Sequence, residues 1–177
     1  MHQFTCHPLV EKPDFVEEMA DISMEEWGHL APDWELDDWA ADIREGLTSK
    51  GIEQTIVAAD SKGAFAGMAR LTSWDMDTRK DLYGWVASVY IKPQHRGLGL
   101  GTWLVAQVEA QAVGEGLAEL HLYTPDAAEF YGRTGWEVLE HATYKGEQVI
   151  IMRKDLAAVM QMRENIQGDN VVPFKTN

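Results

Sequence analysis

The sequence predicts an α/β (α+β) domain whose mixed, mostly antiparallel sheet has about seven strands. Three observations predict it. β-prone segments pair across short turns at 61–63 and 145–147, as in antiparallel hairpins. A helical segment connects the strands expected at 83–91 and 118–123, which makes these two strands parallel. Two helical segments follow the first strand, so the expected element order is β-α-α-β-β-β-α-β-α-β-β.

The first elements are a strand at 5–10 and two amphipathic helices. Asp14 is expected to cap the first helix, and Gly28 to end it. Asp33 is expected to cap the second helix. Both helices have apolar residues at helical spacing, and those of the second helix are Trp34, Leu36, Trp39, Ile43 and Leu47.

The rest of the chain alternates strands with two more helices. Glycines within 97–101 lead into a helix that runs through Val113. Pro125 is suited to the first turn of a helix that runs to Thr134. The expected strands are 54–60, 64–74, 83–91, 118–123, 136–144 and 148–153.

Neither an internal repeat nor a Pro/Gly/Ser-rich linker divides the chain. We therefore expect a single domain at residues 1–154. Residues 155–177 are expected to form a C-terminal helix, at 156–164, and a mobile tail from residue 167 onward.

The composition indicates a globular protein. Of the 177 residues, 45% are hydrophobic and 25% are charged, a balance that excludes a disordered chain. No apolar run approaches the length of a membrane span, and the first residues lack the basic and apolar regions of a signal peptide. We therefore expect a cytoplasmic protein, as a monomer or a homodimer.

Cysteine and histidine usage points to neither a disulfide nor a metal centre. Cys6 is the single cysteine, so no internal disulfide is possible. The six histidines are scattered along the chain without the spacing of metal ligands. No metal is expected as a cofactor.

The chain is strongly acidic, with a formal net charge of −14. A surface this negative repels phosphate backbones and anionic lipids, so neither nucleic acid nor a membrane is expected as a partner. Much of the excess lies between residues 11 and 45, where 13 acids accompany only Lys12 and Arg44 as basic residues. This stretch would attract a cationic molecule; the alternative is that its acids serve solubility alone.

A Gly-rich turn follows the strand at 83–91 and begins a helix. Because Gly97, Gly99 and Gly101 have no Cβ, an anion can approach the unpaired N–H groups and the positive dipole end of the helix. Arg96 adds a positive charge at the rim of this turn. The pattern indicates a site for a pyrophosphate.

Two nucleotide-binding patterns fit this turn less well. A Walker P-loop needs Lys followed by Ser or Thr after its last glycine, where this chain has Thr102 and Trp103. A Rossmann fingerprint needs its third glycine at the place of Thr102 or Leu104, and an acid at the end of the next strand, which here ends in Tyr123. The remaining alternative is that the glycines serve helix packing alone.

Two segments together resemble the GNAT superfamily of N-acetyltransferases. Arg-x-x-Gly-x-Gly at 96–101, after a Val-x-Ile strand end and a proline, is similar to the acetyl-CoA signature of that family. Residues 127–136 are similar to its Ala-x-x-Phe-Tyr-x-x-x-Gly-aromatic segment. The expected element order agrees with the family's fold from Phe4 to Arg153. The resemblance implies a GNAT-like sheet with a splayed parallel pair and transfer of acetyl from acetyl-CoA directly to a primary amine in a ternary complex.

The resemblance also implies which residues contact acetyl-CoA, the co-substrate. In the family the pantetheine arm pairs with the main chain of the first splayed strand, and the pyrophosphate is held by N–H groups of the glycine turn. Thr124 stands where many family members carry an asparagine that contacts CoA. The implied CoA-binding residues are Val89, Tyr90, Ile91, Arg96, Gly97, Leu98, Gly99, Leu100, Gly101, Thr102 and Thr124.

The resemblance gives one catalytic residue and leaves the other open. Tyr131 matches the family's tyrosine that gives a proton to the departing CoA thiolate; the alternative is a core residue. A base must also deprotonate the acceptor ammonium. The family often uses a Glu on the strand expected at 83–91, which has no acid here. The candidates that remain are Asp75, Asp77, Asp81 and His121.

In the family the connection between the first two helices commonly walls the acceptor pocket. Here that connection carries Trp27 and Trp34 among acids, and indole faces with carboxylates suit a cation. We therefore expect a small-molecule or peptide amine, cationic in character, as the acceptor. The alternative is that these tryptophans belong to the core. A non-catalytic acyl-CoA sensor or interaction module on the same fold is the alternative to an enzyme.

Overall fold

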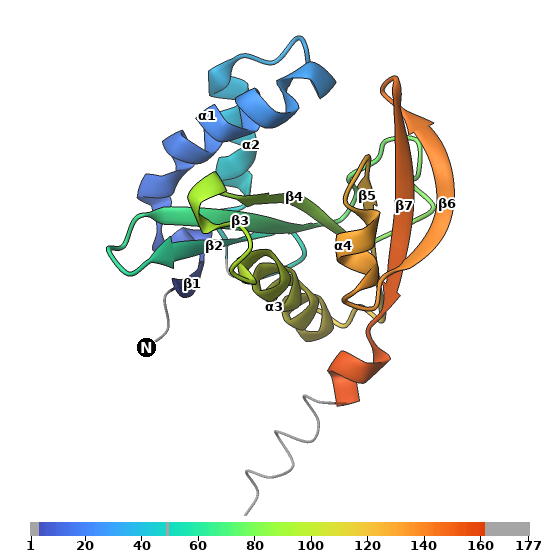
Figure 1. The fold of residues 1–177 in the computed structure, drawn as a ribbon. Coiled ribbons are helices and arrows are strands. Elements are labelled where there is room, and N and C mark those ends of the chain that lie inside the picture. The colour runs from blue at the N-terminus through green and yellow to red at the C-terminus, as the bar shows by residue number, and fades with distance from the viewer. Residues whose placement is uncertain (1–3, 49, 162–177) are drawn as a thin grey trace, which may run out of the picture.

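The computed structural model describes residues 4–48 and 50–161 and contains one seven-stranded sheet (Figure 1). All neighbouring strands are antiparallel except β4 and β5, which are parallel. The strands, in spatial order, are β1 (Phe4–Pro8), β2 (Gln54–Asp60), β3 (Phe65–Thr72), β4 (Trp85–Ile91), β5 (Glu119–Thr124), β7 (Glu147–Asp155) and β6 (Glu137–Tyr144).

Helices cover both faces of the β1–β4 half of this sheet: Figure 1 shows α1 and α2 together on one face and α3 on the other. The α-helices are α1 (Val16–Trp27), α2 (Leu36–Glu45), α3 (Leu100–Gly114) and α4 (Ala128–Gly132). Short 3₁₀ turns lie in the connections between elements: η1 (Leu9–Glu11), η2 (Pro13–Phe15), η3 (Gly28–Leu30) and η4 (Pro93–His95). The expected order of strands and α-helices is confirmed.

The alternation of side chains along β2 and β3 builds two cores. Ile56 and Ala58 point to the α3 side, where they join Leu104 and Val108. Val57 points to the opposite side, where it joins buried residues of α1 and α2. A third cluster lies around Trp85 and the β6–β7 hairpin. These cores fix β4 between the two helical layers.

The parallel pair separates almost as soon as it forms. The single residue pair in register between β4 and β5 is Trp85 with His121, and the His121 N–H donates to the Gly84 carbonyl at 2.9 Å. Beyond this point β4 has no strand partner on its β5 side within the described part of the chain. The expected splayed pair is therefore confirmed.

A β-bulge marks the same stretch of β4. Met68 pairs with Tyr90 and Arg70 with Ala87, so two residues of β4 lie opposite one residue of β3. Ser88, one of the two, has a φ of 51°, which is unusual for a residue with a Cβ. Such a bulge bends the strand and re-aims its backbone groups.

The caps expected for the first two helices are wrong. Asp14 lies inside the η2 turn, and α1 begins at Val16 without a side-chain cap. The second helix begins at Leu36, because Glu35 and Asp38 cap it reciprocally; the Glu35 N–H donates to Asp38 Oδ2 at 2.9 Å. This pair outcompetes Asp33 and leaves residues 31–35 as a connection outside the helix.

The C-terminal part is described only to residue 161. Leu156 is fully buried in the α3 core, and its N–H donates to the Ala118 carbonyl at 2.9 Å. A helical turn follows, within the helix expected at 156–164, while residues 162–177 and the expected tail lie outside the described residues. Among the described helices, none has both the length and the apolar composition needed to cross a membrane.

Candidate active site

A cavity of about 810 Å³ lies between the α1–α2 connection, β4, the start of α4 and the β6–β7 turn. Its walls combine four tryptophans with six carboxylates and two basic side chains. Trp27 and Trp34, expected at the acceptor site, both line it. Trp27 is half-buried and packs against the α1–α2 core, whereas Trp34 is 41% exposed.

Two further tryptophans complete the aromatic wall. The Trp39 ring packs edge-to-face against Trp34 with 4.9 Å between centroids, so α2 and the connection before it form one surface. Trp74 comes from the segment that follows β3 and is 45% exposed. The sequence did not single out Trp74 as a site residue, because it lies far along the chain from the other three.

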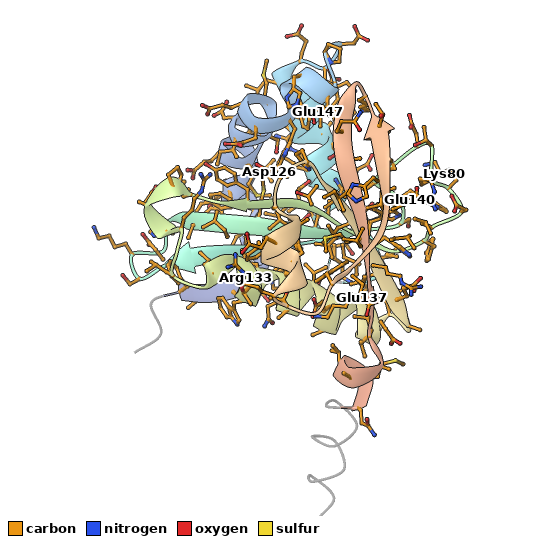
Figure 2. All side chains as sticks on the ribbon, turned by 45° about the vertical axis from the view of Figure 1, so that its right-hand side comes forward. Lys80, Asp126, Arg133, Glu137, Glu140 and Glu147 are labelled. Carbon is orange, nitrogen blue, oxygen red and sulfur yellow. The ribbon has the colours of Figure 1, made fainter. Side chains whose placement is uncertain are left out.

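The charged groups of the cavity are mostly acidic. Two of the six carboxylates have a side-chain partner: Asp42 accepts from Arg70 at 2.7 Å, and Glu147 lies 3.0 Å from His29 Nε2. Figure 2 shows Glu147 beside the α1–α2 end of the molecule and Asp126 below it. The six acids are Glu26, Asp33, Asp42, Asp75, Asp126 and Glu147.

The two basic side chains are held by the protein. Arg70 bonds to Asp42 and lies 3.4 Å from Glu53, and its Nε has no partner among the described residues. The Lys145 ammonium donates to the Leu30 carbonyl at 2.8 Å, which links the β6–β7 turn to the α1–α2 connection. The cavity therefore presents a net negative surface to a ligand.

Asp75 follows Trp74 and lines the cavity as a half-buried residue. Burial raises the pKa of its carboxyl to about 7; Arg70 and Lys145 act against this shift, and the charge of Asp42 adds to it. Its carboxylate makes no hydrogen bond or ion pair with any residue that the structure describes. A carboxyl with these properties is half-ionised near neutral pH.

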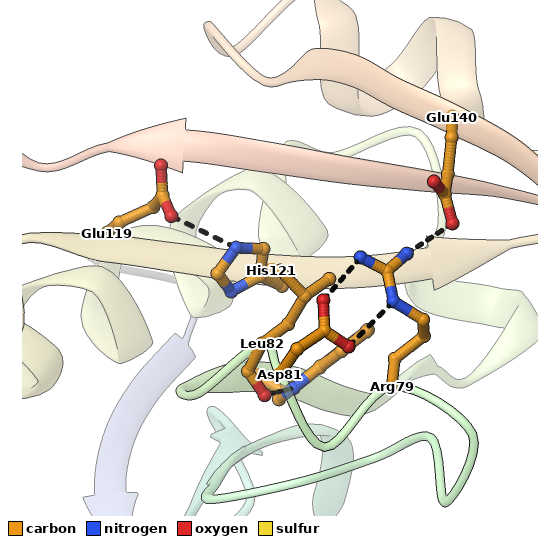
Figure 3. A network of polar contacts seen from close by, with 7 residues as sticks. Arg79, Asp81, Leu82, Glu119, His121 and Glu140 are labelled. Atoms are coloured by element: carbon orange, nitrogen blue, oxygen red, sulfur yellow. Dashed lines mark hydrogen bonds and ion pairs between the residues drawn. The ribbon is translucent and has the colours of Figure 1, made fainter.

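The other base candidates from the sequence do not reach the cavity. Asp81 forms two hydrogen bonds with Arg79, each of 2.9 Å, and Arg79 also pairs with Glu140 (Figure 3). Asp77 is exposed and is not among the lining residues. Neither carboxylate lines the cavity.

His121 is a structural residue of the sheet. It is 3% exposed, with Nδ1 3.2 Å from the Gly84 carbonyl and Nε2 3.1 Å from Glu119 (Figure 3). Its ring also packs against Trp85, with 5.6 Å between centroids. It does not line the cavity.

Tyr131 comes from α4 and lines the cavity while being only 8% exposed. Its carbonyl accepts from the Thr134 N–H at 2.9 Å and from the Trp136 N–H at 3.3 Å, which holds its backbone. Burial raises the pKa of its phenol to about 12, with Asp126 and Asp75 adding in the same direction. The hydroxyl has no partner among the described residues and stays protonated at neutral pH.

Thr124 ends β5 and lies in the connection before α4. Its Oγ1 accepts from the Ala127 N–H at 3.0 Å, and the helix begins at Ala128 rather than at the expected Pro125. Thr124 is 5% exposed and lines the cavity. Its hydroxyl hydrogen remains able to donate.

Of the three β4 residues expected to contact CoA, only Val89 lines the cavity. It lies next to Ser88, on the stretch of β4 that β5 leaves uncovered. The Tyr90 side chain packs toward the α1–α2 core, and that of Ile91 toward the α3 core. Their main chain, not their side chains, is therefore what a ligand in the splay would meet.

The glycine turn lies outside the cavity, on the exposed surface where β4 passes to α3. Gly97 and Gly99 have φ values of 73° and 78°, and nothing lies within 4 Å of a Cβ built on either. Both conformations favour glycine, and Gly99 is the residue before α3. The first three residues of α3, Leu100 to Thr102, have N–H groups that lack partners within the helix.

The other members of the turn differ in their surroundings. A Cβ on Gly101 would lie 3.4 Å from the Phe130 ring, close to an ordinary van der Waals contact. The side chain of Leu100 is 2% exposed and belongs to the core, whereas Leu98 is 52% exposed. Arg96 Nε donates to the Ile91 carbonyl at 2.9 Å, and its guanidinium lies 5.7 Å from the centre of the Tyr90 ring.

The uncovered edge of β4 connects the glycine turn with the cavity. Val89 and Tyr131 both line the cavity, and Val89 lies on the uncovered edge of β4. The same strand runs on to the exposed glycine turn. A long ligand anchored at the turn and laid along the splay would present its end to the cavity. Among the described residues, no group of three or more His, Cys, Asp or Glu could hold a metal ion.

Solved structures of several acetyltransferases share this fold. Aminoglycoside 6'-N-acetyltransferase complexed with coenzyme A has a TM-score of 0.68 at 14% identity, over 86% of this chain and 97% of that one. A spermidine N-acetyltransferase chimera from Vibrio cholerae and hSSAT has a TM-score of 0.63 at 18% identity, over 89% and 98%. Nourseothricin acetyltransferase is 24% identical with a TM-score of 0.50, and the match spans 59% of this chain and 66% of that one.

No curated protein sequence matches this chain. Residues 16–136, by contrast, match the model of the acetyltransferase (GNAT) family. This segment covers more than half of the chain and includes the splayed strands, the glycine turn and Tyr131. The chain therefore belongs to the acetyltransferase (GNAT) family.

Proposed function

We propose that this acetyltransferase moves the acetyl group of acetyl-CoA to a primary amine of a small cationic molecule, by direct attack in a ternary complex. The observation that carries the proposal is the meeting of two features at Val89 and Tyr131. An acidic, aromatic cavity reaches the uncovered edge of β4 there, beside a phenol hydroxyl that has no described partner.

The residues present fit a CoA molecule. The pyrophosphate would bind the N–H groups of the exposed turn, where Gly97 and Gly99 leave open space. The pantetheine arm would pair with the backbone of β4 where β5 leaves it uncovered. The proposed CoA contacts remain Val89, Tyr90, Ile91, Arg96, Gly97, Leu98, Gly99, Leu100, Gly101, Thr102 and Thr124.

Tyr131 is proposed as the general acid. Its raised pKa means that the phenol carries its proton at the start of the reaction. A CoA thiol is a stronger acid than this phenol, so early proton transfer to sulfur is uphill. The phenol first donates a hydrogen bond to the departing sulfur, and the transfer is completed as the amine nitrogen loses its own proton.

The cavity supports a cation as the acceptor. Indole faces of Trp27 and Trp34 attract positive charge, and the carboxylates of Glu26 and Asp33 lie on the same wall without basic partners among the described residues. Aminoglycosides and spermidine, which appear in the names of two of the structural neighbours, are both cationic amines. We extend that class, and neither compound in particular, to this chain.

Matched acceptors test the charge preference. Putrescine, butylamine and γ-aminobutyrate have similar lengths and carry a positive, a neutral and a negative group at the far end. With acetyl-CoA as donor, kcat/KM should fall in that order, and spermidine and an aminoglycoside should follow putrescine. Preference for γ-aminobutyrate would contradict a cation site. Acetyl-CoA binding without turnover on any amine would indicate a binding module instead.

A further inference from the structure

We propose that Asp75 is the general base that takes the proton from the acceptor ammonium. The proposal rests on the acetyltransferase function above and assigns a residue to the deprotonation of the acceptor amine. No residue of β4 can serve, because this strand contains no acid. The carboxylate of Asp75 comes instead from the segment after β3, next to Trp74 of the aromatic wall.

Asp75 shares one cavity with the residues proposed to contact and protonate the co-substrate. It lines the same space as Val89, on the uncovered edge of β4, and as Tyr131, the proposed acid. Its charge acts on the phenols of Tyr123, Tyr131 and Tyr144, which come from three different elements. Asp75 and Tyr131 therefore face one space from two walls, as an acid and a base in one reaction must.

Each of the other five cavity acids is less suited to the role. Asp42 and Glu147 are engaged with Arg70 and His29, respectively. The remaining three, Glu26, Asp33 and Asp126, are exposed residues. Within the described part of the chain, Asp75 alone among the cavity acids is both half-buried and without an ion-pair or hydrogen-bond partner.

The surroundings of Asp75 set its basicity. Burial raises its pKa to about 7, so the carboxylate is a far better proton acceptor than an exposed aspartate and is still substantially ionised at neutral pH. The charged and titratable side chains that act with it are Asp42 on α2, Arg70 on β3, Tyr123 on β5, Tyr131 on α4, Tyr144 on β6 and Lys145 in the β6–β7 turn.

The proton balance of the reaction closes with these two residues. Asp75 takes one proton from the ammonium, and the freed nitrogen lone pair forms the C–N bond to the thioester carbonyl carbon. The C–S bond breaks, and sulfur takes the Tyr131 proton. The second nitrogen proton returns to the Tyr131 oxygen, directly or through water. Asp75 then releases its proton to solvent, which leaves the amide, the CoA thiol and one proton as products.

The decisive experiment compares pH profiles of kcat/KM for wild type and Asp75→Asn, with the best acceptor of the amine panel. Wild type should rise with pH to about 7 and then stay level until the amine itself deprotonates. Asp75→Asn should lose about 10²–10⁴-fold at neutral pH. Its residual rate should climb about tenfold per pH unit up to the amine pKa, because it can use only neutral amine.

Two controls separate a base from a binding group. Asp77→Asn changes an exposed carboxylate two residues away, outside the cavity, and should keep the wild-type profile. Asp75→Glu should restore part of the rate and the level region. A variant Asp75→Asn with raised KM, unchanged kcat and the wild-type profile would overturn the assignment of Asp75. Wild-type protein that acetylates no amine would overturn the proposed function as well, so the two failures are distinct.

Discussion

Lys154 and the buried Glu109 form an ion pair that supports the turn after the helix of Tyr131. Lys154 Nζ lies 2.7 Å from Glu109 Oε1 and 2.8 Å from Oε2, and it donates a third bond to the Thr134 carbonyl at 2.7 Å. The Trp136 indole N–H donates to the same Glu109 at 3.1 Å. One network thus links α3, β7 and the end of α4.

Lys154→Ala should destabilise the protein and slow the reaction. It leaves the Glu109 carboxylate buried without its cation, which costs about 3–5 kcal/mol of unfolding free energy. It also frees the turn that holds the Tyr131 carbonyl, so kcat should fall. Chemical denaturation and steady-state kinetics measure the two effects. The joint replacement Glu109→Leu with Lys154→Met removes both charges and should recover much of the stability; an equal loss in that variant would contradict this explanation.

Tyr131→Phe should lower kcat about 10²–10⁴-fold while CoA binding is retained. The substitution removes only the hydroxyl, which has no described partner, and keeps the ring contacts with Phe130 and Trp136. Kinetics and calorimetric titration with CoA give the two numbers. Tyr83→Phe is the matched control, since Tyr83 is 47% exposed and lies outside the cavity. An unchanged kcat in Tyr131→Phe would remove this tyrosine from the mechanism.

Gly99→Ala should weaken CoA binding more than it weakens the fold. The φ of Gly99 is 78°, so a Cβ there strains the backbone by about 1–2 kcal/mol and narrows the approach to the first N–H groups of α3. Gly116→Ala is a matched control at the opposite end of α3, with a φ of 84° and equally open space. It should show a similar loss of melting temperature with unchanged CoA affinity. Similar CoA affinities in the two variants would place the pyrophosphate elsewhere.

Asp75→Asn should melt at a higher temperature than wild type at pH 8. The pKa of Asp75 is raised in the folded chain, so ionisation of this residue opposes folding progressively as pH rises from about 4 to 7. Asparagine removes that opposition. The difference in melting temperature should shrink toward pH 4, where Asp75 is protonated in the folded wild-type chain. A difference that is independent of pH would mean that packing, rather than ionisation, separates the two proteins.

Local patterns in the sequence predict a large part of this fold. The glycine of each hairpin turn, Gly63 and Gly146, has a positive φ that few other residues adopt. The helix between β4 and β5 forms a crossover connection, and two strands joined in this way are parallel. Such features depend on residues that are neighbours in the chain, and they can therefore be predicted without the structure.

Features that depend on residues far apart in the sequence cannot be predicted in the same way. Asp33 could cap a helix as well as another acid, but the reciprocal bonds of Glu35 and Asp38 place the start of α2 at Leu36. Asp75, Asp77 and Asp81 are equivalent in the sequence. They differ only once Arg79 has paired with Asp81 and the surrounding elements have half-buried Asp75. The bulge at Ser88 likewise carries no signal of its own.

The single residue pair that joins β4 to β5 divides the sheet into a four-stranded and a three-stranded part. Main-chain groups beyond Trp85 are left without the neighbour that an ordinary sheet would provide. A ligand whose amides bond there acts as the missing strand and ties the two parts to each other. In the proposed mode of CoA binding, the hydrogen bonds that set the affinity for the co-substrate would also hold the two parts of the sheet together.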